Sequence, residues 1–130
     1  MVALSDHKHN QFAYISMDAV FFETSTFSNL RPAYLKEEAY RSLQMALMAD
    51  PAMGDLMPRT GGFRKLRWPD SRRGKGKRGG LRVIYYWLFG DGQFWMFSIY
   101  DKDELENLTA AQERQLKGAI NDELKKRGMS

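Results

Sequence analysis

Basic side chains that could bind phosphate are concentrated in one short segment of the chain. Half of the 20 lysines and arginines lie between Arg59 and Arg82, where Asp70 is the single acidic residue. The ten basic residues are Arg59, Arg64, Lys65, Arg67, Arg72, Arg73, Lys75, Lys77, Arg78 and Arg82. A block of this kind predicts a polyanionic partner, and nucleic acid is the commonest one.

The alternation of side chains along a strand predicts which of these cations share a surface. In the segment FRKLRW, Lys65 and Arg67 would point to one face of a short strand. Leu66 and Trp68 would point to the other face and anchor the strand in the core. Arg82 begins the next predicted strand, and we expect it on the same surface as Lys65 and Arg67. The planar guanidinium group of arginine suits bidentate binding of phosphate, and a sheet places such groups more accurately than a tail.

The segment PDSRRGKGKRGG, residues 69–80, is predicted to be a glycine-rich basic loop whose backbone can lie against phosphate. An isolated KGKR motif is usually a solvated loop. Here the length of the block, its near lack of acids and the cations on the flanking strands favour contact with nucleic acid. The residues predicted to bind the nucleic acid are Arg64, Arg72, Arg73, Lys75, Lys77 and Arg78. The G-x-x-x-x-G-K-[ST] pattern is absent, which excludes a phosphate loop of the NTPase type.

Several kinds of catalysis are excluded by residue type. The chain has no cysteine, and its two histidines, His7 and His9, lie in a polar leader before the first predicted strand. Thiolate catalysis, zinc sites built on cysteine and a Ser/His/Asp triad are therefore not expected. Asp101, Asp103 and Glu104 could hold metal ions in a nuclease, but charged residues between a strand and a helix are usually solvated. We predict no metal and no other cofactor.

Cleavage of RNA without a metal remains compatible with these residues. In that reaction the 2′-hydroxyl of the RNA attacks the neighbouring phosphate, and the protein supplies a base, an acid and cations. Lys65 or Lys102 could act as the base, because a crowd of positive charges favours the neutral amine. Tyr85, Tyr86 or Tyr100 could stack on a base of the RNA, although strands this apolar favour packing of the rings in the core.

The predicted elements form one domain over residues 18–130. A strand over Ala19–Glu23 precedes a short helix that Pro32 interrupts, and a second helix runs over 34–49 and ends at Asp50-Pro51. Three strands and a helix that opens with the capping box Thr109–Gln112 complete the order β-α-α-β-β-β-α. The predicted strands cover residues 63–68, 81–89 and 93–100. This order predicts an α+β fold with a small, mainly antiparallel sheet packed by helices.

Residues 1–17 are expected to form a flexible N-terminal extension with little role in the fold. The N-terminus is polar where a signal peptide would need an apolar stretch, and no apolar run approaches the roughly 20 residues of a membrane span. Together with the lack of cysteine, these features favour a cytoplasmic protein.

Three ordered segments, GDLMPRTGGFRKLRW, GKGKRGGLRVIYYW and IYDKDELENL, resemble the RelE/ParE superfamily, and most closely its HigB-type, RelE-like toxins. The resemblance covers the chain from about Ala19 to the last helix and implies a RelE-like toxin fold. It implies the toxin of a type II toxin–antitoxin system, an endoribonuclease that enters the ribosomal A site and cuts mRNA without a metal. The implied partners are the ribosome, mRNA and a small helix-turn-helix antitoxin.

The resemblance also implies roles for four basic residues. Lys65 and Arg67 match a pair of basic positions on the second strand of the family. Arg82 matches the arginine that opens the third strand and is expected to contact the scissile phosphate. Lys102 matches a basic residue that follows the last strand. The predicted catalytic residues are therefore Lys65, Arg67, Arg82 and Lys102.

Two alternative functions are compatible with the sequence. ParE relatives share the fold but inhibit DNA gyrase, and a basic module could also bind RNA without cutting it. The chain departs from RelE after the last strand, because Asp103 stands beside Lys102 and no tyrosine follows Tyr100. The general base and a tyrosine that shuttles protons are therefore left unassigned.

Overall fold

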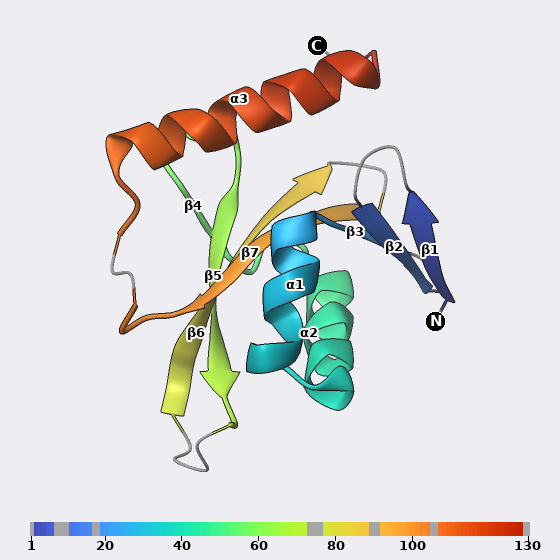
Figure 1. The fold of residues 1–130 in the computed structure, drawn as a ribbon, viewed down its shortest axis with the longest axis vertical. Coiled ribbons are helices and arrows are strands. Elements are labelled where there is room, and N and C mark those ends of the chain that lie inside the picture. Colours follow the sequence, from blue (N-terminus) through green and yellow to red (C-terminus); the bar gives the residue numbers. More distant parts are fainter. Residues whose placement is uncertain are drawn as a thin grey trace.

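The computed structural model describes residues 2–6, 11–16, 19–72, 77–88, 92–104 and 107–128. The described strands form one seven-stranded sheet in the order β1-β2-β3-β7-β6-β5-β4 (Figure 1). Neighbouring strands run antiparallel, except that β3 and β7 run parallel. The elements are β1 Val2–Asp6, β2 Gln11–Ser16, β3 Ala19–Glu23, α1 Ser25–Tyr34, α2 Glu37–Ala49, β4 Asp55–Leu56, β5 Arg64–Asp70, β6 Lys77–Leu88, β7 Gln93–Asp101 and α3 Ala110–Lys126. The predicted α+β class with a mainly antiparallel sheet is confirmed.

Strands β1 and β2 extend the sheet beyond the predicted domain. β2 pairs with β3, and β1 pairs with β2 at the edge of the sheet. No strand was predicted before Ala19, because pairing with an available sheet edge decides such strands more than local sequence does. The flexibility of residues 1–17 stays a prediction, and His7 and His9 lie outside the described residues.

The prediction that Pro32 interrupts the first helix was wrong. Pro32 lies inside α1, which continues for two further residues. The side chain of Arg31 is buried and closes the end of the helix by donating to the carbonyl oxygen of Leu35 at 2.9 Å. The N–H of Leu35 in turn donates to the carbonyl of Arg31 at 2.7 Å. These two bonds offset the single donor that proline removes from a helix.

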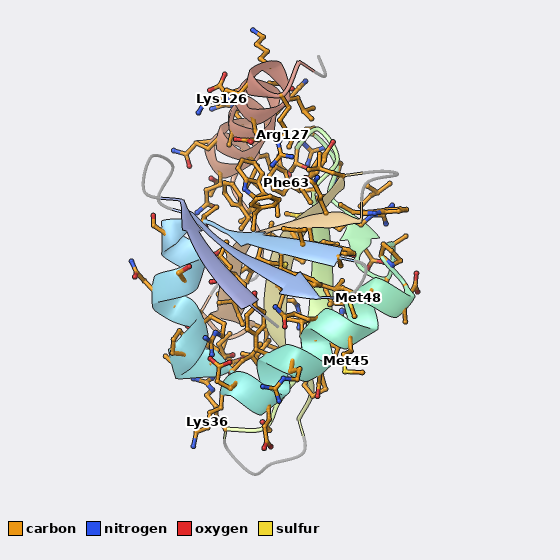
Figure 2. The ribbon with its side chains drawn as sticks, turned by 90° about the vertical axis from the view of Figure 1, so that its right-hand side faces the viewer. Lys36, Met45, Met48, Phe63, Lys126 and Arg127 are labelled. Carbon is orange, nitrogen blue, oxygen red and sulfur yellow. The ribbon has the colours of Figure 1, made fainter. Side chains whose placement is uncertain are left out.

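Two hydrophobic cores lie on opposite faces of the sheet. The first core lies under α1 and α2 and includes Val83 and Tyr85. The second lies under α3 and includes Phe63, Ile84 and Leu116, and Figure 2 shows Phe63 next to that helix. β6 supplies alternate residues to both cores, because this central strand is apolar on both faces. The strand therefore presents its even-numbered residues, Arg82 included, to the α3 face.

The start of α3 is held by the predicted capping box. The hydroxyl of Thr109 accepts from the N–H of Gln112 at 3.1 Å, and Oε1 of Gln112 accepts from the N–H of Thr109 at 2.8 Å. Leu116 and Ile120 then bury one stripe of the helix against the sheet. No helix in the described ranges is long and apolar enough to cross a membrane.

Candidate functional site

Three predicted site residues lie side by side on the α3 face of the sheet. Arg67 is directly opposite Arg82 in the pairing of β5 with β6, and Lys65 is directly opposite Ile84. Directly opposed side chains of antiparallel strands share a face, with Cβ atoms roughly 4.5–5.5 Å apart. Ile84 belongs to the core under α3, so all three cations project from that side. The prediction that they share one surface is confirmed, and we call Lys65, Arg67 and Arg82 the cationic row.

Tyr100 lies at the end of this row, directly opposite Arg82 in the pairing of β6 with β7. Its side chain is buried, and its hydroxyl has no hydrogen-bond partner among the described residues. Burial raises the pKa of the Tyr100 hydroxyl, while the nearby charge of Arg82 opposes this rise. The phenol is therefore neutral at physiological pH and can donate a hydrogen bond. Buried hydroxyls normally have a partner, so a ligand that reaches this hydroxyl would supply one.

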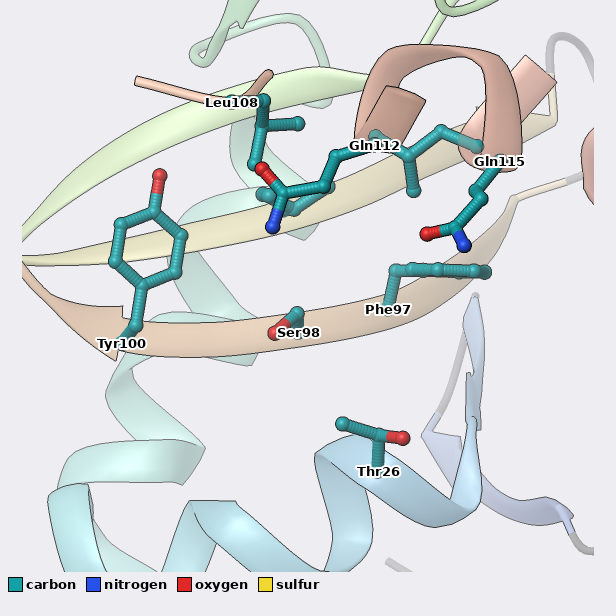
Figure 3. Close-up of a pocket in the computed structure, with 9 residues that line it drawn as sticks. Thr26, Phe97, Ser98, Tyr100, Leu108, Gln112 and Gln115 are labelled. Atoms are coloured by element: carbon teal, nitrogen blue, oxygen red, sulfur yellow. The ribbon is translucent and has the colours of Figure 1, made fainter. Parts of the chain in front are cut away.

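A cavity of about 450 Å³ lies beside Tyr100, between the sheet and the start of α3. Figure 3 shows Phe97, Ser98 and Tyr100 along β7 on one side of it, and Leu108, Gln112 and Gln115 on the other. Thr26, Ile84 and Leu116 also line it, and none of the described residues in the lining is charged. The cavity thus places uncharged hydrogen-bonding groups next to the cationic row.

The two predicted lysines lie at different edges of the site. Lys65 borders a hollow of about 250 Å³ together with Asp55, Leu108 and Glu113. Lys102 follows β7 directly, and its N–H donates to the carbonyl of Gly80 at 3.0 Å. The side chain of Lys102 is exposed. Lys65 is thus a member of the row, whereas Lys102 follows the strand that carries Tyr100.

Arg64 belongs to a different environment from its neighbour Lys65. Its Nη1 donates to the carbonyl oxygens of Gly54 at 2.8 Å and Ala52 at 3.2 Å. It is opposite Tyr85, which lies in the core under α1 and α2. The guanidinium group therefore braces the segment before β4. A role of Arg64 in RNA binding stays a prediction.

Arg72 ties the first part of the basic loop to the end of β7. Its Nε and Nη2 donate to the carboxylate of Asp70 at 3.0 and 2.8 Å, and Nη2 also lies 3.2 Å from Oδ2 of Asp101. Both carboxylates are buried, and the guanidinium lies 4.7 Å from the centre of the Tyr34 ring. These contacts give Arg72 a structural role, and its predicted contact with RNA is untested.

Replacing Arg72 with alanine is expected to lower the free energy of unfolding by about 1–3 kcal/mol, because it removes a guanidinium group that pairs with two buried carboxylates. Arg67→Ala is the matched control, since Arg67 is exposed and should change the free energy of unfolding by less than about 0.5 kcal/mol. Urea denaturation of both variants measures the difference. Equal, small losses would show that Arg72 does not brace the loop.

The acidic residues after β7 organise a turn. The N–H of Asp103 donates to Oδ1 of Asp101 at 2.9 Å, and the N–H of Asp101 donates to Oε1 of Glu104 at 3.0 Å. Asp103 and Glu104 are exposed as predicted, but Asp101 is buried because it pairs with Arg72. Within the described ranges, no three side chains of His, Cys, Asp or Glu are grouped to hold a metal ion.

The rest of the basic loop is only partly described. Arg73 and Lys75 lie outside the described residues, as do the side chains of Lys77 and Arg78. Strand β6 begins at Lys77, four residues before the predicted start, and Lys77 is opposite Asp70. The hairpin is longer than expected because β5 also continues to Asp70, and a register shift separates the Asp70–Lys77 pair from the Trp68–Leu81 pair.

Sequence reasoning did not assign four uncharged groups to the site. Tyr100 was expected to pack in the core, and its position opposite Arg82 was the signal that could have identified it. Ser98, Gln112 and Gln115 reach the cavity through the placement of α3 on the sheet, for which the sequence carried no signal.

The arrangement can bind a phosphate group beside an uncharged ring. Arg67 and Arg82 offer planar sets of donors to phosphate oxygens, and the Tyr100 hydroxyl can donate to the same group or to an atom bonded to it. The cavity next to them can take a neutral part of the same ligand. A comparison with models of known protein families found no match for this sequence.

Proposed function

We propose that the protein is the toxin of a type II toxin–antitoxin system, a cytoplasmic endoribonuclease that cuts mRNA on the ribosome and so inhibits translation. One observation carries this proposal: Lys65, Arg67 and Arg82 lie together on paired strands next to Tyr100, whose hydroxyl has no hydrogen-bond partner among the described residues. Cations for a phosphate and a neutral proton donor are two of the requirements of metal-free RNA cleavage. The resemblance of three ordered segments to RelE-like toxins supports mRNA as the substrate.

The proposed reaction uses the RNA as its own nucleophile. The 2′-oxygen forms a bond to the neighbouring phosphorus, and the bond from phosphorus to the 5′-oxygen of the next nucleotide breaks. The products are a 2′,3′-cyclic phosphate and a free 5′-hydroxyl group. A base takes the proton of the 2′-hydroxyl, and an acid gives a proton to the leaving oxygen.

The described residues can be given roles in this reaction. Arg67 and Arg82 stabilise the extra negative charge of the phosphate in the transition state. Tyr100, which burial keeps protonated through its raised pKa, donates a hydrogen bond or a proton to the leaving oxygen. Lys65 and Lys102 are the two candidates for the base, and the pH dependence of cleavage by single alanine variants separates them.

The proposed partners follow from the rest of the surface. The basic loop, with Arg73, Lys75, Lys77 and Arg78, docks onto ribosomal RNA, and this contact weakens as the salt concentration rises. A helix-turn-helix antitoxin neutralises the toxin. A gene for such a protein beside the gene for this chain would support the proposal.

Primer extension on mRNA after brief expression tests the function. The wild-type chain should create new 5′ ends at fixed positions within codons, whereas the double variant Lys65→Ala/Arg67→Ala should leave the message intact and allow growth. Lys125→Ala/Lys126→Ala is the matched control, because it removes two exposed cations at the far end of α3 and should remain toxic.

Other outcomes identify the alternatives. Intact message together with DNA damage would indicate a gyrase inhibitor of the ParE kind. Salt-sensitive RNA binding without growth arrest would indicate a non-catalytic RNA-binding module. Full toxicity of a folded Lys65→Ala/Arg67→Ala variant would contradict the assignment of the site.

A further inference from the structure

We propose that the cavity between α3 and strands β6 and β7 binds the base of one nucleotide of an RNA chain, while the cationic row holds the phosphate of that nucleotide. The proposal rests on the proposed function, because it names a subsite for the same substrate. It assigns a ligand to Phe97, Ser98, Gln112 and Gln115, which have no part in the cleavage chemistry described above.

The lining of the cavity suits a neutral, planar ligand that forms hydrogen bonds. Its volume of about 450 Å³ lies within the roughly 300–1,000 Å³ of small-molecule sites. Two aromatic rings, two carboxamides and the hydroxyls of Thr26, Ser98 and Tyr100 surround it, and no described residue of the lining is charged. A phosphate would therefore be bound outside the cavity, on the cationic row, and an uncharged heterocycle inside it.

The capping box determines which atom of the Gln112 carboxamide can form a hydrogen bond with a ligand in the cavity. Oε1 of Gln112 accepts from the N–H of Thr109, and an N–H group requires an acceptor, so the other atom of the carboxamide is the nitrogen. Figure 3 shows this nitrogen pointing toward Ser98 across the cavity. The hydroxyl of Ser98 is a second potential donor. The cavity therefore offers donors to the carbonyl oxygens and ring nitrogens of a base, while the Tyr100 hydroxyl serves the phosphate.

A bulge in β7 turns Phe97 toward the cavity. Tyr85 is opposite Met96 and Ile84 is opposite Ser98, so Phe97 is an extra residue without an opposed partner in β6. Bulges of this kind redirect side chains near functional sites. The hydroxyl of Thr24 donates to the carbonyl of Phe97 at 2.8 Å and holds the bulge in place. The Phe97 ring is half-buried and is a platform on which a base can stack.

The cavity and the row are close enough for one nucleotide to reach both. Tyr100 lines the cavity and is directly opposite Arg82, and Ile84 lines it and is directly opposite Lys65. Opposed residues of neighbouring strands have Cβ atoms about 5 Å apart. A base in the cavity would therefore carry its phosphate to Arg82 and Arg67.

NMR titration of the full chain with inorganic phosphate and with each of the four nucleoside 3′-monophosphates tests the proposal. The best nucleotide should bind about tenfold more tightly than phosphate, because one stacked base contributes an affinity of that order. It should also shift the side-chain amide signals of Gln112 and Gln115, which phosphate alone should leave in place. A nucleotide that binds no more tightly than phosphate and leaves these signals unchanged would overturn the proposal.

Two variants separate the base subsite from the fold. Ser98→Leu fills the cavity and should bring the ratio of nucleotide affinity to phosphate affinity close to one. Gln112→Glu keeps an acceptor for the capping box but removes the donor, so it should weaken nucleotide binding while α3 stays capped. Unchanged ratios in both folded variants would contradict the proposal.

The same measurements distinguish this proposal from the proposed function. A dinucleotide that lacks the 2′-hydroxyl should bind more tightly than the monophosphates if the ligand is RNA, and weaker binding would overturn RNA in favour of a free nucleotide. If bases bind in the cavity but the message stays intact in cells, the endoribonuclease proposal fails and the subsite stands. If the message is cut but no base shifts Gln112, the subsite fails and the endoribonuclease stands.

Discussion

Replacing Arg82 with alanine is expected to slow the cleavage of mRNA by about 100- to 1,000-fold, the usual cost of removing one donor that stabilises transition-state charge. Arg82 is central to the proposed site, because it is opposite both Arg67 and Tyr100 on neighbouring strands. Its Nη1 already donates to the carbonyl of Leu81 at 3.1 Å, which orients the guanidinium on the sheet. The rate is measured on purified ribosomes with a defined message.

Two further variants define the role of this side chain. Arg82→Lys should retain part of the rate, because an ammonium group keeps the charge but lacks the planar fork of the guanidinium. Arg41→Ala on α2 removes an exposed arginine far from the row and should cleave at the wild-type rate. Full activity of a folded Arg82→Ala variant would show that phosphate is bound elsewhere.

Replacing Phe63 with alanine is expected to lower the free energy of unfolding by about 3–5 kcal/mol. Phe63 is fully buried, and its ring centre lies 5.0 Å from that of Phe97 and 5.3 Å from that of Tyr86. Alanine would leave a void between the sheet and α3, the two elements that form the cavity. Because many domains are stable by only about 5–15 kcal/mol, the variant should also lose activity at elevated temperature.

The control for this prediction is Phe22→Ala. Phe22 is half-buried beside the same core and lies under the guanidinium of Arg127, 5.2 Å from ring centre to Cζ. Its loss should cost about 1–2 kcal/mol, since less apolar area is removed from the interior. Urea denaturation provides both values. A loss below about 1 kcal/mol for Phe63→Ala would mean that α3 is held mainly by other contacts.

Local rules predicted the parts of the site that depend on neighbouring residues. Alternation along a strand placed Lys65 and Arg67 on one face, and the Thr109–Gln112 spacing identified the capping box. Partners from distant segments decided the rest. The bond from Arg64 to Gly54 depends on how two segments meet, which no local pattern reveals.

Tyr100 shows a different limit of sequence reasoning. Its ring satisfies the expectation of core packing, and only the pairing of strands shows that its hydroxyl ends beside Arg82. The same holds for Asp101. Its place in a charged segment between a strand and a helix predicted a solvated side chain, but Asp101 is buried and pairs with Arg72. Burial of a ring or a carboxylate in a short domain follows from the register of the sheet rather than from residue type.

The parallel pairing of β3 with β7 has a consequence for how the protein is made. Thr24 and Phe97 bond to each other although they are 73 residues apart in the chain. Contacts this distant in sequence are slow to form and cannot form before both segments have been synthesised. While the chain is being synthesised, β3 therefore emerges before its partner β7 exists, and Tyr100 does not yet lie beside Arg82. The site is therefore complete only after β7 has been synthesised and has paired with β6.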